Sequence, residues 1–449
     1  MIPAVNHYWL KNAHVPVSLL NVEDTAITAR QTRDGLSLVD IEIAAGEIAS
    51  IVAAGTGEIG ETATVNLRGG QVWPCFVDMH THLDKGHIWE RSPNPNGTFP
   101  SALETARIDS QKYWQAEDVY RRMEFGIKCS YAHGTKAIRT HIDSFDEQAA
   151  ISLGVFKSLQ QEWSDRVTLQ AVTLVTLDYY QTPEGIILAD RIAEIGGILG
   201  GVAFMHPDLD AQLDTVFSLA KERNLNLDFH TDETDDPDSI CLQKVADAAL
   251  RNEFTGQIIC GHCCSLAVQS PEVVEKTLDL VKQARIGIVS LPMCNLYLQD
   301  RQPNRTPRWR GITLLQELKQ HGISAAVASD NCRDPFYGFG DHDVLEVFTQ
   351  AVRIAHLDTP YGDSPCTVTK TAADLINLPN VGRIGVGLPA DLIVFKGRSF
   401  SEVLSRSQHD RIVLRKGKSI DTTLPNYAEL DDLVARNTLS HRSVIWMTQ

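Results

Sequence analysis

Histidines and acidic residues recur in this chain directly after short apolar segments. His80 and His82 are two residues apart after one such segment, so an extended backbone would place both side chains on one face. His230, His262 and Asp330 follow three later segments of the same kind. Three imidazoles and one carboxylate that converge would suit Zn²⁺ or Fe²⁺ and leave one coordination position for water. The pattern therefore predicts a hydrolytic metal site.

The segments that carry these residues alternate with longer helical stretches, such as Glu117–Ala132, Leu209–Arg223 and Pro271–Ala284. This βαβ rhythm predicts an α/β fold, a (β/α)8 TIM barrel over residues 70–384, whose strand ends open onto one face. A doubly wound open sheet is the alternative that periodicity allows. The predicted strands are Val72–Met79, Lys136–Ile142, Val167–Val175, Gly200–Phe204, Leu225–Phe229, Gln257–Cys260, Ile286–Ser290 and Ser324–Ser329.

Both ends of the chain have strand-like sequence. Short strands broken by Gly and polar turns run from Leu19 to Leu67, and Gly385–Phe395 returns to this character. Residues 1–69 and 385–449 are therefore predicted to pair into one small β domain beside the barrel. Gly55–Gly60 matches the G-x-G-x-x-G pattern, but a strand-like stretch follows it where a helix is needed, so it is interpreted as a hairpin loop.

Composition excludes several classes of protein. The 449 residues carry a formal charge of −16, which argues against general attraction to nucleic acid or to an anionic membrane. No signal peptide and no apolar stretch long enough to span a bilayer is seen, so a cytoplasmic location is expected. Nine cysteines, an odd number, argue against a secreted disulfide scaffold.

Over residues 70–357 the sequence resembles the amidohydrolase superfamily, and specifically its cytosine deaminase branch. Gly385–Phe395 resembles the return of that family's chain to its β-sandwich domain. The motifs that carry the resemblance are Phe76–Lys85 (FVDMHTHLDK), Ala132–Thr135 (AHGT), Arg139–Asp143 (RTHID), His230–Glu233 (HTDE), Arg310–Thr313 (RGIT), and Asp330-Asn331 followed by Asp334-Pro335.

The resemblance implies that His80, His82, His230 and Asp330 bind one divalent ion, Zn²⁺ or Fe²⁺. It also implies that Glu233 is the proton shuttle and that His262 orients the attacking water, so the implied catalytic residues are Glu233, His262 and Asp330. Many superfamily members bridge two metals with a carboxylated lysine on the fourth strand. Residues 200–206 contain no lysine, which favours the single-metal form.

The substrate pocket departs from the cytosine deaminases. Thr176 stands where they have a Gln, Asn331 where they have a second Asp, and Phe336 where they have a Trp. These changes remove hydrogen bonds that the polar edge of cytosine requires, so another ring is expected. His141 is a further candidate for the pocket wall.

The run that ends at Lys85 also resembles relatives that act on N-substituted aminotriazines. Lys85 could therefore bind a carbonyl oxygen of an oxidised ring, or it could form an ion pair with a nearby acid such as Asp84 or Asp109. The sequence leaves both interpretations open.

The prediction is thus a deaminase of a small cyclic amidine that releases ammonia or an amine, with a heterocyclic substrate as its partner and a homo-oligomeric state. The alternatives are ring-opening hydrolysis of a cyclic amide, a redox protein that uses Cys260 and Cys263, and a barrel that only binds. The first would yield product without ammonia, and the second would be independent of metal. The third is disfavoured because a barrel that only binds would have no need to keep all of the residues His80, His82, His230, Glu233, His262 and Asp330.

Overall fold

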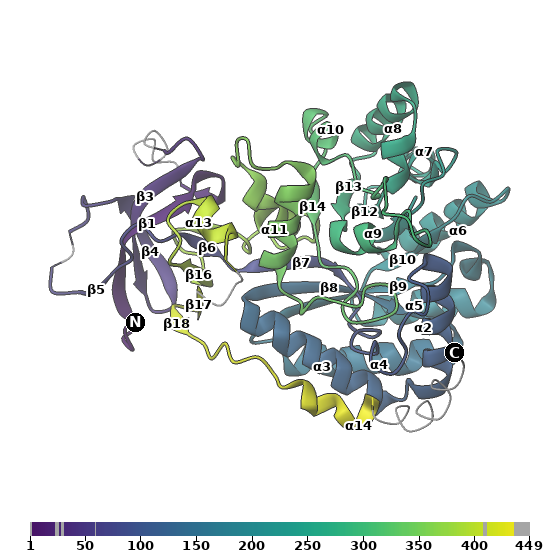
Figure 1. Cartoon of the computed structure of the whole chain (residues 1–449), viewed down its shortest axis with the longest axis horizontal. Helices are drawn as coiled ribbons and strands as arrows, with labels where there is room; N and C mark the ends of the chain where they lie inside the picture. The colour runs from purple at the N-terminus through teal and green to yellow at the C-terminus, as the bar shows by residue number, and fades with distance from the viewer. Residues whose placement is uncertain (1, 23–26, 28–30, 59, 407–410, 435–449) are drawn as a thin grey trace.

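The computed structural model describes residues 2–22, 27, 31–58, 60–406 and 411–434. Figure 1 shows two parts: a β-rich part that contains the N-terminus, and a larger part in which helices surround a set of strands. Parts of the predicted terminal β segments, at residues 23–26, 28–30, 59, 407–410 and 435–449, lie outside the described residues. Within the described ranges, no helix is long and apolar enough to cross a membrane.

Eight parallel strands form the centre of the larger part, in two sheets. The order is β7-β8-β9 in one sheet and β10-β11-β12-β13-β14 in the other. Parallel pairing requires crossover connections, and helices make them, as the alternating sequence predicts. The strands are β7 (Phe76–Thr81), β8 (Thr135–Asp143), β9 (Thr168–Leu174), β10 (Leu199–Ala203), β11 (Leu227–Thr231), β12 (Ile258–His262), β13 (Gly287–Ser290) and β14 (Ala325–Val327).

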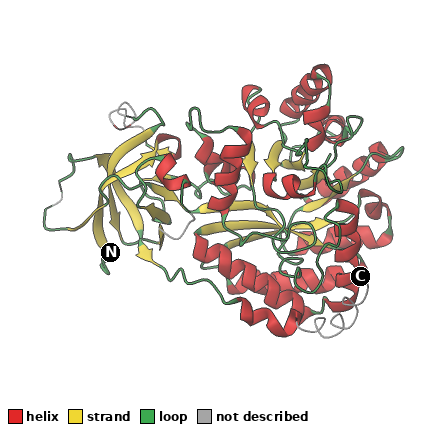
Figure 2. Cartoon of the chain, in the orientation of Figure 1, coloured by secondary structure: helices red, strands yellow, loops and turns green. Residues whose placement is uncertain are grey.

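Helices cover the outer faces of these sheets (Figure 2). The three predicted helices are confirmed to within one residue at either end, because each has an apolar stripe and clear end signals. The helices of this part are α2 (Phe99–Tyr113), α3 (Ala116–His133), α4 (Asp146–Glu162), α5 (Pro183–Glu194), α6 (Leu209–Arg223), α7 (Cys241–Arg251), α8 (Pro271–Gln283), α9 (Pro292–Leu298), α10 (Leu315–Gln320), α11 (Val344–Ala355) and α12 (Lys370–Leu375).

The two sheets meet along two seams, one between β9 and β10 and one between β7 and the segment after β14. Isolated β-bridges join the strands there, without a continuous ladder of hydrogen bonds among the described residues. Between β9 and β10, Val202 N donates to Val175 O at 2.8 Å. Between β7 and the end of β14, Asp330 N donates to His80 O at 2.9 Å, and Thr81 Oγ1 donates to Asp330 O at 2.8 Å. The α/β class is confirmed, whereas the predicted barrel is not closed by regular pairing.

Strands from both ends of the chain form the β-rich part. One sheet has the order β4-β3-β1-β5, a second has β18-β17-β16-β6, and β2 pairs with β15. One core of buried side chains joins both ends, for example Ile41 with Leu392. The strands are β1 (His7–Pro16), β2 (Leu20–Asn21), β3 (Leu36–Ala44), β4 (Glu47–Ala53), β5 (Ala63–Asn66), β6 (Val72–Pro74), β15 (Ile384–Gly385), β16 (Leu392–Phe395), β17 (Arg411–Arg415) and β18 (Lys418–Ser419), with helix α13 (Phe400–Leu404). Helix α14 (Asp431–Val434) lies instead against α3 of the larger part (Figure 1), where Leu433 packs with Phe125.

Three details differ from expectation. β1 was not predicted, although it pairs with both β3 and β5. The predicted strand Val72–Met79 is divided after Pro74, so that β6 pairs with β16 while β7 pairs with β8. The Gly55–Gly60 segment joins β4 and β5, which lie at opposite edges of one sheet, so the prediction of a hairpin is wrong; Ile59 lies outside the described residues.

Gly200 offers a test of the seam between β9 and β10. Its N donates to Thr173 Oγ1 at 2.9 Å, and a Cβ there would lie closer than 3.0 Å to Val172 Cγ1 and to the carbonyl oxygen of Asp228. We expect Gly200→Ala to lower the free energy of unfolding by about 1–3 kcal/mol or more, because the backbone must shift. Urea unfolding measures this.

Gly154→Ala is the matched control. Gly154 lies in α4 with nothing within 4 Å of its Cβ position, so alanine there should stabilise the helix slightly. Equal stability of the two variants would show that the seam tolerates a side chain.

Candidate functional site

The histidines and the aspartate singled out in the sequence meet at one end of the strands. His80 lies in β7, His82 directly follows it, His230 lies in β11, and Asp330 follows β14. His82 Nε2 is 3.2 Å from Asp330 Oδ1, and His80 Nε2 is 3.7 Å from the same oxygen. His82 Nε2 and His230 Nε2 are 3.4 Å apart. Convergence from three strands far apart in sequence creates one buried cluster, with no residue more than 7% exposed.

The cluster fits a metal ion because its polar atoms lack protein partners. Both ring nitrogens of His80, Nδ1 of His82 and His230, and both carboxylate oxygens of Asp330 are buried without a hydrogen bond among the described residues. Buried polar atoms are normally paired, and unpaired ones carry a large desolvation cost. A divalent cation would satisfy imidazole lone pairs and a carboxylate together.

The backbone at the strand ends is strained where it presents these groups. Asp330 and His262 have φ values of +60° and +68°, in the left-handed region that non-glycine residues seldom adopt. Such strain persists where surrounding structure holds it, and it is common at functional sites. Gly261 leaves room for the cluster, because a Cβ there would lie 3.0 Å from His80 Cε1.

His141 lies deeper than a pocket wall would require. It projects from β8, is fully buried, and its ring centroid is 3.9 Å from that of His80. Its Nε2 is 3.7 Å from Oδ1 of Asp228. One ring nitrogen from each of His80, His141 and His230 lies within 4.8 Å of the other two, so His141 packs directly against the other two imidazoles. Its predicted contact with substrate stays a prediction.

Glu233 and His262 are linked by a residue that the sequence did not single out. Asn295, in α9, donates from Nδ2 to Glu233 Oε1 at 2.9 Å, and the same nitrogen is 3.1 Å from His262 Nδ1. A carboxylate oxygen and an unprotonated Nδ1 can both accept from the amide group. His262 then carries its proton on Nε2, which has no partner among the described residues. Only the fold brings these three together, because no motif includes Asn295.

Burial changes the acid–base properties of this group. Burial, and next the negative charge of Asp330, raises the pKa of Glu233 well above its usual value, while Lys85 and the Asn295 hydrogen bond oppose the rise. Burial lowers the pKa of His262 to about 4, so its ring is neutral at pH 7. A protonatable carboxylic acid thus stands beside a neutral imidazole donor.

Lys85 forms an ion pair with an acid other than the two predicted. Its Nζ is 2.9 Å from Asp143 Oδ1, and it lies 5.1 Å from the centroid of the Phe336 ring. Asp109 instead binds Arg91, and Asp84 Oδ2 accepts from the backbone N of Asp143. The expected partners Asp84 and Asp109 are therefore wrong as ion-pair partners, although an ion pair exists.

Asn331 and Phe336 lie in the loop after β14 and are tied to Asp334. Asn331 Nδ2 donates to Asp334 Oδ2 at 2.7 Å, and the backbone N of Phe336 donates to Asp334 Oδ1 at 2.8 Å. Thr176, half-buried at the end of β9, makes a bridge with Val202.

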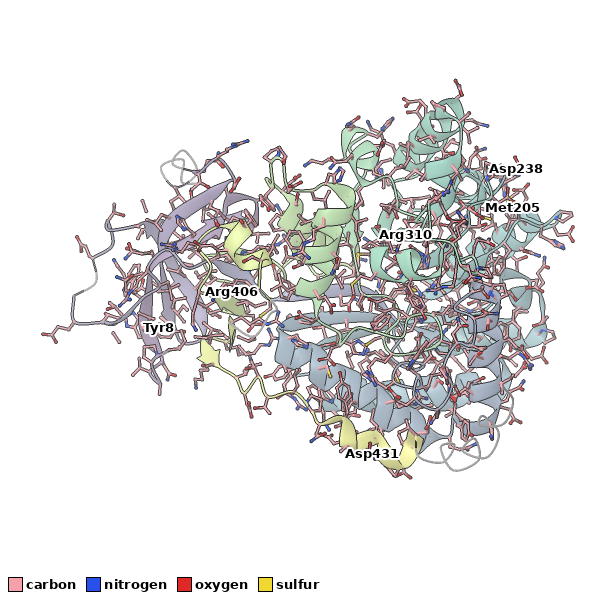
Figure 3. All side chains as sticks on the ribbon, viewed as in Figure 1. Tyr8, Met205, Asp238, Arg310, Arg406 and Asp431 are labelled. Atoms are coloured by element: carbon pink, nitrogen blue, oxygen red, sulfur yellow. The ribbon has the colours of Figure 1, made fainter. Side chains whose placement is uncertain are left out.

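The loops that follow β10 and β11 contain Met205 and Asp238. Both residues lie at the end of the molecule away from Tyr8 (Figure 3).

The redox alternative finds no support in the cysteines. Cys260 and Cys263 are fully buried, and burial raises the pKa of both thiols above the usual value. Thiolates are the reactive species, and reactive cysteines are partly exposed with a lowered pKa. These two thiols therefore pack as small apolar groups.

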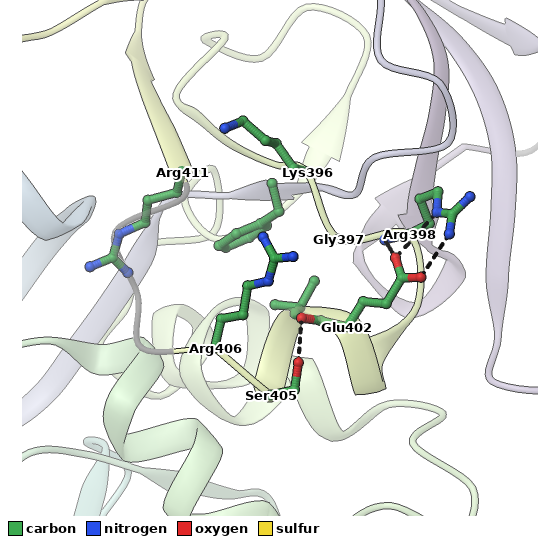
Figure 4. Close-up of a pocket in the computed structure, with 9 residues that line it drawn as sticks. Lys396, Gly397, Arg398, Glu402, Ser405, Arg406 and Arg411 are labelled. Atoms are coloured by element: carbon green, nitrogen blue, oxygen red, sulfur yellow. Dashed lines mark hydrogen bonds and ion pairs between the residues drawn. The ribbon is translucent and has the colours of Figure 1, made fainter.

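A surface cavity of about 440 Å³ lies elsewhere, in the β-rich part (Figure 4). Its basic side chains include Arg398, paired with Glu402, and Arg411, paired with Asp343. The described residues that line this cavity include no histidine, so they cannot form a site of the kind predicted from the sequence. The cluster at the strand ends is therefore the candidate active site.

Comparisons with known proteins identify the family. Residues 124–420 match the model of the Amidohydrolase family. The chain is 50% identical to a pterin deaminase of Rhizobium rhizogenes (strain K84 / ATCC BAA-868) over 435 residues, which covers 96% of this chain and 98% of that protein. It is 25% identical to N-isopropylammelide isopropyl amidohydrolase of Pseudomonas sp. (strain ADP) over 395 residues, 86% of this chain and 94% of that protein.

The fold has solved counterparts. The crystal structure of 5-methylcytosine deaminase from Klebsiella pneumoniae, liganded with 5-fluorocytosine, superposes with a TM-score of 0.79 at 24% identity and covers 94% of this chain and 98% of that one. The resemblance seen in the sequence motifs is confirmed, and this chain belongs to the amidohydrolase family.

Proposed function

We propose that this chain is a metal-dependent hydrolytic deaminase whose substrate is a pterin. The observation that carries the proposal is the 50% identity to pterin deaminase along nearly the whole chain, together with the buried histidine cluster at the strand ends. The general prediction, a hydrolase that removes an amino group from a ring, is confirmed by the same relation. The pterin ring carries such an amino group next to ring nitrogens, with a carbonyl nearby.

His80, His82, His230 and Asp330 are the proposed ligands of one divalent ion, Zn²⁺ or Fe²⁺. Their unpartnered buried nitrogens and oxygens support this assignment. When bound there, such an ion supplies Lewis acidity, which lowers the pKa of water from about 15.7 to about 7 and makes it a nucleophile at neutral pH.

Glu233 is the proposed proton shuttle. Its raised pKa makes the carboxylate a stronger base toward the attacking water and keeps the acquired proton available for the leaving group. One hydrogen of water finally resides on the ring nitrogen and the other on the departing ammonia. His262 Nε2–H, held in that tautomer by Asn295, is placed to donate to the oxygen that attacks.

Substrate recognition is assigned to the groups around Lys85. The ammonium would donate to the ring carbonyl oxygen, while Phe336 supplies an apolar face for the ring. Asn331 and Thr176 are further proposed contacts, since both lie at strand ends on the same side. Pterin is a larger ring system than cytosine, so the departures from the cytosine deaminase pattern at these positions are expected for a pterin substrate.

Broader features stay proposals. We propose that the two sheets act as one (β/α)8 barrel over residues 70–384, with residues 1–69 and 385–449 as the β-sandwich domain, because the same strand ends supply all the ligands. A homo-oligomeric state is proposed on the family resemblance, and a cytoplasmic location stays a prediction from the sequence.

The proposed reaction is tested with metal-loaded protein and a panel of pterins, cytosines, guanine and aminotriazines, with ammonia release as the readout. We expect ammonia from pterin, and Glu233→Gln should reduce turnover by about 10²–10⁴-fold while it keeps the metal, because the amide cannot carry the proton. Asp330→Ala is the contrasting variant and should lose metal.

Normal turnover of Glu233→Gln would refute the proposed shuttle. Consumption of substrate without ammonia would favour ring-opening hydrolysis. Absorbance of the pteridine ring system, followed beside ammonia, distinguishes these outcomes.

Asn295 is predicted to position Glu233 and His262. Asn295→Leu should reduce kcat by about 10–100-fold with metal content unchanged, because both partners lose their shared donor. The lost hydrogen bond also raises the pKa of Glu233 further, so the limb of the pH–rate profile that belongs to Glu233 should move to higher pH.

Gln299→Leu is the control. Gln299 donates only to the backbone oxygen of Glu233, at 3.4 Å, and should leave that limb in place. If the Asn295 variant kept the wild-type pH profile, Asn295 would be only a structural residue.

Lys85→Met separates the two roles of Lys85. If the ammonium binds the substrate carbonyl, KM for pterin should rise about 10–100-fold, the usual effect of losing a charged hydrogen bond. Asp143→Asn removes the ion pair but retains the ammonium, so its KM should change far less. Steady-state kinetics and thermal unfolding of both variants give the answer: equal losses of stability with unchanged KM would make the ion pair purely structural.

A further inference from the structure

A second buried group of metal-binding side chains lies outside the catalytic cluster. It consists of His87, in the loop after β7, and of Cys332 and His342, in the loop after β14. All three are nearly buried, with exposures of 4%, 2% and 2%. One donor atom from each lies within 4.8 Å of the other two. We propose that this group binds a second divalent transition-metal ion, Zn²⁺ by preference, that joins the two loops.

The spacing of the two imidazoles matches that of ligands on one ion. His87 Nε2 and His342 Nε2 are 3.2 Å apart. Two nitrogens that bind Zn²⁺ at about 2.0–2.1 Å in tetrahedral geometry are separated by roughly 3.3 Å. The catalytic cluster provides an internal comparison, because His82 Nε2 and His230 Nε2 are 3.4 Å apart there. In both pairs the Nδ1 atoms are buried without a partner among the described residues.

The chemistry of the donors indicates the class of metal. Two imidazoles with one thiolate suit Zn²⁺, a borderline-soft ion, and disfavour Mg²⁺ or Ca²⁺, which prefer oxygen. On binding, the Cys332 thiol would release its proton to solvent, so that sulfur donates as a thiolate. The two carboxylates adjacent to His342 are already engaged: Asp341 contacts His133 at 3.2 Å and Tyr427 at 3.0 Å, and Asp343 pairs with Arg411 at 2.7 Å. The fourth position is therefore left to water.

A glycine in the neighbouring helix leaves space for one of these rings. Gly126 of α3 lies against His342, since a Cβ there would be 2.9 Å from His342 Nε2. The two loops are already joined by hydrogen bonds from His87 N to Cys332 O at 3.2 Å and from Trp89 N to Arg333 O at 2.9 Å. An ion at this point would reinforce that junction.

The position gives the ion a function. Lys85 lies two residues before His87, and Asp334, which holds the Phe336 loop, lies two residues after Cys332. A metal that ties the two loops would therefore keep both walls of the proposed substrate pocket in place. The role is structural, because no member of the group belongs to the catalytic cluster.

Cobalt provides the test, because the proposed ligands of this second site include a thiol and those of the catalytic site do not. The full-length protein is stripped of metal, loaded with Co²⁺, and examined by absorption spectroscopy and by metal analysis. We expect a thiolate-to-cobalt charge-transfer band in the near ultraviolet and about two ions per chain. Cys332→Ser should abolish the band and lower the metal content to about one ion, and His342→Gln should weaken the band strongly.

Cys366→Ser is the matched control, because Cys366 is also buried, its Sγ donates to the backbone oxygen of Ser18 at 3.5 Å, and it belongs to none of the metal-binding groups found among the described residues. This variant should keep the band and the second ion. A wild-type protein that binds one ion and shows no charge-transfer band overturns the proposal, whether or not the variants fold. A band that persists in Cys332→Ser would overturn it as well.

Discussion

The structure depends on one electrostatic constraint: several histidines and a carboxylate are buried together, and most of their polar atoms have no hydrogen-bond partner among the described residues. His80, His82, His230 and Asp330 would each be costly in an apolar interior, and a cation, as proposed, would offset that cost. The parallel strands satisfy that constraint, because their ends converge although they are distant in sequence. Strained backbone at Asp330 and the missing side chain at Gly261 show that local geometry has been fitted to the cluster.

Rigid strands and variable loops divide the work of the site. The proposed metal ligands lie in the strands or within three residues of a strand end, so their spacing is set by the main-chain hydrogen bonds of the sheets. The groups proposed to contact the ring, such as Lys85 and Phe336, lie in loops instead. Such a division explains how sequence relatives of this chain can include both a pterin deaminase and an N-isopropylammelide isopropyl amidohydrolase. The loops can change while the strands stay the same. The His87–Cys332–His342 group lies where two of these loops meet.

The residues proposed for proton transfer are linked by a side chain that motif reasoning does not include. Asn295 lies on the short helix α9 and contacts both Glu233 and His262. No special spacing in the sequence marks this asparagine, and the contacts arise only because α9 packs against the ends of β11 and β12. The same is true of Asp143, whose ion pair with Lys85 replaces the expected partners because Asp109 is already bound by Arg91.

By itself, the sequence determined the α/β class, the eight strands and the three predicted helices, and it singled out the histidines and the aspartate that converge in the buried cluster, because periodicity and residue spacing are local properties. It could not reveal β1 as a central strand, the break after Pro74, or the incomplete pairing between the two sheets. These depend on which strand edges meet, and an edge is satisfied by partners distant along the chain. Tertiary structure alone decided that Asn295, Asp143 and the Cys332 group stand beside the site, since contact between side chains follows from packing and leaves no regular pattern in sequence.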